Sequence, residues 1–119
     1  MNTAIINRLK EGSIKTVILF GDSEKMPPPP YIVVKPEPGF NNDRQNYRII
    51  VHRVQGENDL SEDYIFNELP ELLTKNNWLE TDSGKKFRVM NNSDWYGPIA
   101  LNDDGTIAYE RIFYAPRLI

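Results

Sequence analysis

Apolar residues recur at helical spacing near the start of this chain. Ile5, Ile6 and Leu9 lie among polar neighbours, and Gly12 follows as a natural end for a helix. We therefore expect a short amphipathic helix over Asn2 to Glu11.

Beyond this helix the pattern changes to compact β-branched runs and then to alternation, which are both typical of strands. Strands are predicted at Lys15 to Phe20, Tyr31 to Val34 and Gln45 to Val54. Pro27 to Pro30, just before the second of these, favour a stiff polyproline II segment. Lys35 to Asp43 is rich in turn formers and predicts a long exposed loop, so the strands on either side of it should form an antiparallel pair.

A second helix is predicted over Ser61 to Asn76. Ser61 supplies a capping oxygen, and acidic residues follow in the first turn, where the helix dipole favours them. The apolar stripe that should cover the sheet consists of Ile65, Phe66, Leu69, Leu72 and Leu73. Pro70 lies inside this helix, so we expect a kink or break near Leu69.

The last part of the chain returns to strand patterns. Thr81 to Gly84 has the composition of a hairpin turn, and strands are predicted at Lys86 to Met90 and Thr106 to Tyr114. Asn91 to Leu101, between them, has no clear period. The order of elements predicts an α+β fold, a mainly antiparallel sheet of four to five strands with two helices packed on one face.

Composition and charge narrow the classes of function. A chain of 119 residues is expected to form a single domain over residues 1–119. Its net charge of −3 has the wrong sign for a protein that binds a phosphate backbone. The lack of cysteine excludes disulfides and thiolate zinc sites. The longest apolar run, Val17 to Phe20, is far shorter than the ~18 residues of a membrane span, so we expect a soluble protein, and we expect no cofactor.

Candidate catalytic and metal-binding residues are few. His52 is the only histidine, and no partner at a recognisable spacing accompanies it. We interpret His52 as a structural or surface residue and expect no enzymatic activity. The acidic residues form two clusters, Glu57, Asp59, Glu62 and Asp63, and then Asp103 and Asp104. Helix capping explains the first cluster and a turn explains the second, so no metal site is predicted.

Two groups of residues remain as candidates for binding. The first group, Arg44, Arg48, Arg53 and Tyr47, would form either a basic aromatic face for nucleic acid or, as the acidic neighbours and the net negative charge favour, ordinary strand surface. Trp95 and Tyr96 lie in a turn-like segment, where such side chains serve either as interface anchors or as a plug for the core.

The layout of the chain resembles the tail-terminator and head–tail joining families of long-tailed phages. The shared features are an N-terminal amphipathic helix, a strand, a proline-bearing lead over Met26 to Pro30 into the strand Tyr31 to Val34, a long loop, a strand, the helix Ser61 to Asn76 and closing strands. In these families a Pro-Tyr-Ile-Val segment such as Pro30 to Val33 recurs as the second strand. The resemblance covers most of the chain, and the fourfold proline run and Pro70 depart from the pattern.

The resemblance implies a virion structural protein that caps or completes the tail tube and joins it to the neck. It implies a homo-oligomeric ring, typically a hexamer, that contacts the tail tube protein and neck or connector proteins. DNA would pass through the ring without specific binding, and no membrane would be involved. Assembly would take place in the host cytoplasm, and the protein would end in the virion. The candidate interface residues are Pro27, Pro28, Pro29, Pro30, Glu37, Phe40, Asn41, Asn42, Asp43, Arg44, Trp95 and Tyr96.

Three alternatives stay open. Within the structural class, the chain would be a head-completion or stopper protein of the neck. A small nucleic-acid-binding module would instead show affinity that falls steeply with salt. A small enzyme would depend on His52.

Overall fold

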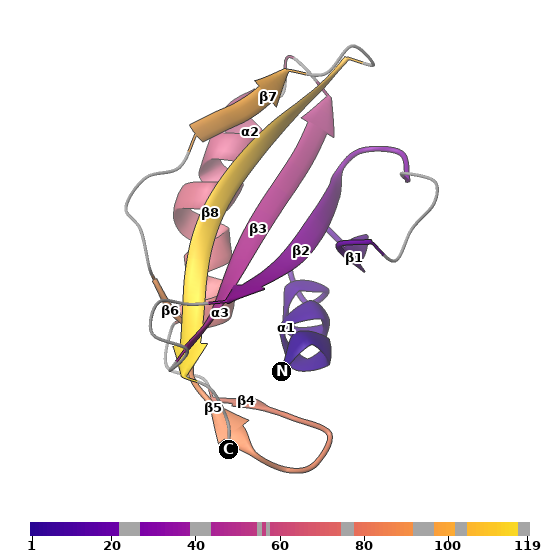
Figure 1. Cartoon of the computed structure of the whole chain (residues 1–119). Coiled ribbons are helices and arrows are strands. Elements are labelled where there is room, and N and C mark those ends of the chain that lie inside the picture. The colour runs from indigo at the N-terminus through magenta and orange to yellow at the C-terminus, as the bar shows by residue number, and fades with distance from the viewer. Residues whose placement is uncertain are drawn as a thin grey trace.

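A mainly antiparallel sheet forms the centre of the computed structural model, which describes residues 1–21, 27–38, 44–54, 56, 58–74, 78–91, 97–101 and 105–116. Two helical segments pack against one face of this sheet, and Figure 1 shows one of them, α2 to α3, behind β3 and β8. The predicted α+β class with helices on one face is confirmed.

In the described part of the chain the sheet has six strands in the order β1-β2-β3-β8-β6, with β7 also paired to β8. The strands are β1 (Val17–Leu19), β2 (Tyr31–Pro38), β3 (Arg44–Val54), β6 (Met90–Asn91), β7 (Gly97–Leu101) and β8 (Thr106–Pro116). β1 is parallel to β2, and the other pairs are antiparallel. The predicted pairing of the strands around Tyr31–Val34 and Gln45–Val54 is therefore confirmed.

The predicted loop over Lys35 to Asp43 is wrong in its first half, because β2 continues through Pro38. The Ile32 amide donates to Thr16 O, and Val34 O accepts from the Phe20 amide, so every second residue of β2 directs its amide toward β1. Pro36 and Pro38 have this same parity and lie beyond the end of β1. The backbone nitrogens of both prolines therefore point toward the unpaired edge of β2, so the absence of their N–H groups removes no hydrogen bond between β2 and β3.

The proline run before β2 also differs from the prediction. Pro28 to Pro30 form bends, with a cis peptide bond between Pro29 and Pro30, in place of the expected polyproline II rod.

The core lies between the helices and the sheet. Tyr47, Ile49 and Val51 of β3 are buried on this side, and Ile32 and Val34 of β2 lie beside them. The helices and β8 complete the core with Ile5, Leu9, Tyr64, Ile65, Leu69, Leu73, Ile107, Tyr109 and Phe113.

Helix α1 (Asn2–Leu9) matches its prediction, but Gly12 has another role than a left-handed helix cap. A Cβ atom on Gly12 would lie 2.6 Å from Leu72 Cδ1 and 2.7 Å from Glu68 Oε2. The adjacent Ser13 donates from its amide and its hydroxyl to the two Glu68 oxygens, at 2.6 and 2.8 Å. Gly12 therefore permits the close approach of the α1 turn to the second helix.

The second helix runs as α2 (Asn58–Asp63), the π-helical turn η2 (Tyr64–Glu68) and α3 (Leu69–Thr74). It begins at Asn58, three residues before the predicted Ser61 cap. The predicted disturbance near Leu69 is present as the π turn, in which the Leu69 amide donates to Tyr64 O.

A small hairpin, β4 (Leu79–Glu80) with β5 (Lys86–Phe87), follows the second helix. Its turn is the predicted Thr81 to Gly84 segment, in which Gly84 has a φ of +87°. The strand predicted over Lys86 to Met90 is split, because Phe87 pairs with β4 whereas Met90 pairs with β8. None of the helices in the described ranges has the length and apolar character needed to cross a membrane.

Candidate functional site

The face of the sheet that points away from the helices is formed by alternate residues of β2, β3 and β8, and we call it the open face. Its members are Tyr31, Val33, Lys35 and Glu37, then Arg44, Asn46, Arg48, Ile50 and His52, and Ala108, Glu110, Ile112 and Tyr114. Within the described ranges, no helix packs on this face (Figure 1). Tyr31, Val33, Ala108 and Glu110 are buried, so the half-buried side chains around them form the accessible surface.

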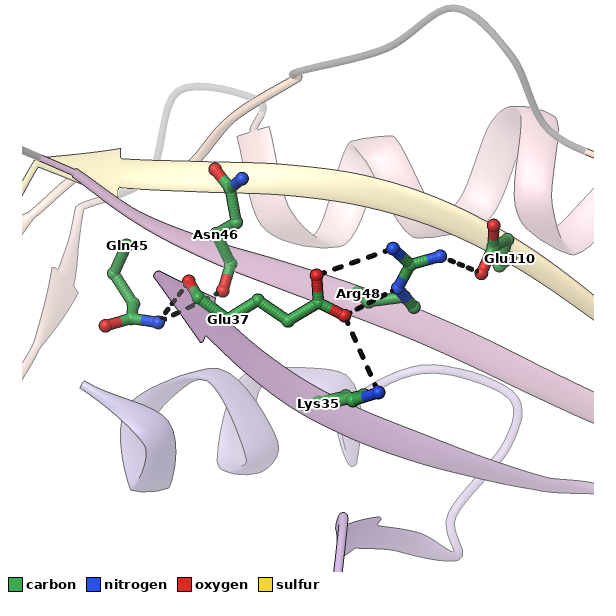
Figure 2. Close-up of polar contacts among 6 residues, drawn as sticks. All are labelled: Lys35, Glu37, Gln45, Asn46, Arg48 and Glu110. Carbon is green, nitrogen blue, oxygen red and sulfur yellow. Dashed lines mark hydrogen bonds and ion pairs between the residues drawn. The ribbon is translucent and has the colours of Figure 1, made fainter. Parts of the chain in front are cut away.

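Arg48 lies at the centre of a charged network across the three long strands. Its Nε donates to Glu37 Oε1 at 2.8 Å, and its Nη1 donates to Glu110 Oε2 at 2.6 Å. Lys35 Nζ lies 3.8 Å from Glu37 Oε1. Figure 2 shows the guanidinium between the two carboxylates, with Gln45 bonded to the backbone oxygen of Glu37 farther along β2. The network thus fixes β2, β3 and β8 to one another by side chains as well as by backbone bonds.

The pair of Glu37 and Arg48 within this network stays ionised near neutral pH. Hydrogen bonds from Arg48 hold the pKa of the Glu37 carboxyl below its ordinary value, and the charge of Lys35 acts in the same direction. Hydrogen bonds to Glu37 and Glu110 raise the pKa of Arg48 above its ordinary value. The Glu37 carboxylate and the Arg48 guanidinium therefore persist as a charged pair on a half-buried surface, which suits polar contact with another protein.

Aromatic rings occupy both ends of the open face. Tyr31 and His52 stack with their ring centroids 4.5 Å apart and an interplanar angle of 9°. At the other end the Arg44 guanidinium lies 4.4 Å from the centroid of the Tyr114 ring. His52 is thus a half-buried, stacked residue of the sheet surface.

The structure brings together only some of the predicted interface residues. Glu37 and Arg44 are both on the open face, Glu37 inside the charged network and Arg44 against Tyr114. Pro27 to Pro30 lie at the entry to β2, at the Tyr31 end of this face, with Pro28 and Pro30 exposed. Outside the described residues are Phe40, Asn41, Asn42, Asp43, Trp95 and Tyr96.

The basic aromatic face, considered above as an alternative to ordinary strand surface, is not formed. Tyr47 and Arg53 belong to the helix side of β3, whereas Arg44 and Arg48 belong to the open face. Tyr47 is buried, and burial raises its pKa to about 12. Arg48 is engaged by two carboxylates, so a phosphate would have to displace them.

Sequence reasoning missed Lys35, Arg48 and Glu110 as members of one site. Successive residues of a strand point to opposite faces, so Arg48 faces away from the core on which its neighbour Tyr47 is buried. This alternation is the feature of the sequence that indicates the orientation of Arg48. Glu110 comes from a strand distant in sequence, and its partnership with Arg48 depends on the pairing of β3 with β8.

The acidic residues form no metal site in the part of the chain that the structure describes, where no group of three or more possible ligands is found. Glu62 and Asp63 are exposed on α2. Glu57, Asp103 and Asp104 lie outside the described residues, as does the side chain of Asp59.

A shallow depression runs between α1 and α3. It is lined by Arg8, Glu11, Glu71 and Leu72. Arg8 Nε pairs with Glu11 at 2.9 Å, and its Nη1 donates to Leu72 O at 3.3 Å. Two of its lining charges therefore bind one another, and the open face remains the better candidate for an interface.

Comparison of the sequence with protein-family models and with curated proteins finds no match.

Proposed function

We propose that this chain is a virion structural protein that forms a ring and completes the tail tube of a long-tailed phage, where the tube meets the neck. The support is the layout: a short amphipathic helix, an edge strand, a proline-bearing lead into β2, the long strand β3, a second helix and closing strands. This is the order of elements on which the resemblance to the tail-terminator and head–tail joining families rests.

The observation that carries the proposal is the asymmetry of the sheet. One face is closed by α1 and the second helix, while the open face presents a braced, charge-balanced network of Lys35, Glu37 and Arg48 with Glu110. Because the half-buried Glu37 and Arg48 are held by their mutual bonds, a partner meets side chains that are already ordered. Such pre-ordering reduces the entropic cost of binding and suits a permanent contact in an assembled particle.

In this proposal the chain acts by binding rather than by catalysis. The open face contacts the tube or neck protein, and the ring surrounds the DNA channel. The net charge of −3 is compatible with DNA passing through without being held.

Electron microscopy of tail tubes mixed with the purified protein tests this function. We expect rings seated at one end of the tubes, and we expect Lys35→Glu to abolish seating, because it places a third carboxylate beside Glu37 and Glu110. Lys35→Arg, which keeps the charge, serves as the matched control. A protein that leaves the tube ends bare, with or without the substitution, contradicts the proposal, and binding to the head side instead indicates a stopper protein of the neck.

A further inference from the structure

The outward side of the second helix combines exposed apolar residues with charges of one sign. Leu60 is 55% exposed, and Phe66 is 56% exposed, so the prediction that Phe66 helps to cover the sheet is wrong. Glu62 and Asp63 are also exposed and precede Phe66 by four and three positions, so they are its neighbours on the helix surface. Asn58 to Thr74 contains five acidic residues and no basic one. We call the surface formed by Leu60, Glu62, Asp63 and Phe66 the helix face.

The β4–β5 hairpin carries an exposed aromatic residue beside charges that are mainly of the opposite sign. Trp78 is 53% exposed, and the Arg88 guanidinium lies 4.6 Å from the centroid of its ring. Lys86 of β5 and Arg88, two positions further on, are both exposed, and the exposed Glu80 lies opposite Lys86 on the same side of the hairpin, which therefore carries two positive charges and one negative charge. The other side of the hairpin is buried in the core through Leu79 and Phe87. We call the surface formed by Trp78, Lys86 and Arg88 the hairpin face.

The two faces lie at different ends of the molecule. The chain is elongated, with principal extents of 42 × 30 × 27 Å. In Figure 1 the hairpin extends beyond the lower end of the sheet, while α2 lies toward the upper end. One copy therefore offers its helix face at one end and its hairpin face at the other.

We propose that the helix face of one copy binds the hairpin face of the next, an inference that rests on the ring function proposed above and names its subunit contact. Trp78 covers Phe66 and Leu60, and Arg88 and Lys86 face Glu62 and Asp63. Exposed aromatic residues flanked by complementary charges are the usual anchors of protein interfaces. Because the two surfaces differ, the contact is head-to-tail, and it closes into a ring if the rotation between neighbours allows.

Sedimentation velocity over a concentration series measures this contact directly. The double variant Glu62→Lys/Asp63→Lys should weaken self-association about a hundredfold or more, as should Lys86→Glu/Arg88→Glu, since each places like charges together. Asp82→Lys, which adds positive charge to the hairpin, should leave association as strong as in the wild type or strengthen it. Lys10→Glu is the matched control, because Lys10 is exposed at the end of α1 and belongs to neither face, and the substitution changes the charge by as much as Arg88→Glu does. It should leave association within about threefold of the wild type.

Mixing the two double variants provides a test that a mere loss of folding cannot mimic. Each variant keeps one wild-type face, and its reversed face complements the reversed face of the other variant, so the mixture should recover assemblies that neither forms alone. Oligomers that persist unchanged in both double variants would overturn the proposed contact while leaving the ring function standing. A wild-type chain that stays monomeric throughout the series overturns the contact and the ring together, whereas rings that never join tail tubes overturn only the function.

Discussion

At the scale of single residues, Arg48 has the largest role on the open face, because it is bonded to carboxylates from both neighbouring strands. We expect Arg48→Met to lower the free energy of unfolding by on the order of 1–3 kcal/mol, since Glu110, whose side chain is only 10% exposed, loses its charged partner. Urea unfolding measures the change. The free energy of unfolding of Arg48→Lys should lie between those of the wild type and Arg48→Met. An Arg48→Met protein as stable as the wild type would show that the network adds no stability.

Glu37 gives the same network a dependence on pH. Its pKa in the folded chain lies below the ordinary value of 4.5, chiefly because Arg48 donates to it. The stabilisation from ionised Glu37 is therefore complete when the pH is above the ordinary pKa, and it is lost as the pH falls through the pKa of the folded chain. The difference in unfolding free energy between wild type and Glu37→Gln should be present at about pH 7 and shrink below about pH 4.5. A difference that is constant over this range, or one that survives in an Arg48→Met background, would contradict this cause.

At the scale of elements, Pro70 shapes the second helix through the hydrogen bonds that it cannot make. In an α-helix Ile65 O would accept from the Leu69 amide, but that amide donates to Tyr64 O instead. In a π-helix Ile65 O would accept from the amide of residue 70, but Pro70 has no N–H. Neither backbone donor is therefore available to Ile65 O. Arg111 of β8 donates to this buried carbonyl from Nη1 at 2.9 Å. The π turn and the sheet are thus joined at the point where the proline interrupts the helix ladder.

This arrangement predicts that Arg111 and Pro70 are energetically coupled. Arg111→Met should destabilise the wild type by about 1–3 kcal/mol, because it leaves a buried carbonyl without a donor. In a Pro70→Ala background the new amide can serve Ile65 O, so the same substitution should cost less. A double-mutant cycle by chemical denaturation measures the coupling, and strictly additive effects would refute it.

Element patterns in the sequence predicted most of the fold, for physical reasons that also explain the errors. Helix α1, β3 and β8 have clear periods and are found where expected. The end of β2 was missed because Pro36 and Pro38 are poor strand residues except on an unpaired edge, and β1 leaves that edge open. The split between β5 and β6 was missed because Phe87 and Met90 have different partners, which depends on tertiary pairing.

At the scale of the whole molecule, the binding surfaces were less predictable than the elements. Glu37 and Arg44 were identified from the sequence and lie on the open face. Their partners Glu110 and Tyr114 come from β8, and the opposed helix and hairpin faces depend on how the elements are arranged in space. Strand pairing brings charges that are distant in sequence onto one surface. Because the patterns in a single sequence do not give this pairing, they cannot reveal the surface.

The central claim is that this chain functions as a subunit of a closed assembly. Native mass spectrometry tests it most directly, because it counts the copies of a 13.8 kDa chain in each particle. We predict one dominant species with more than two copies and a fixed stoichiometry, which dissociates as ionic strength rises because salt screens the charged contacts. A single monomeric species at every protein concentration and at low salt would contradict the claim.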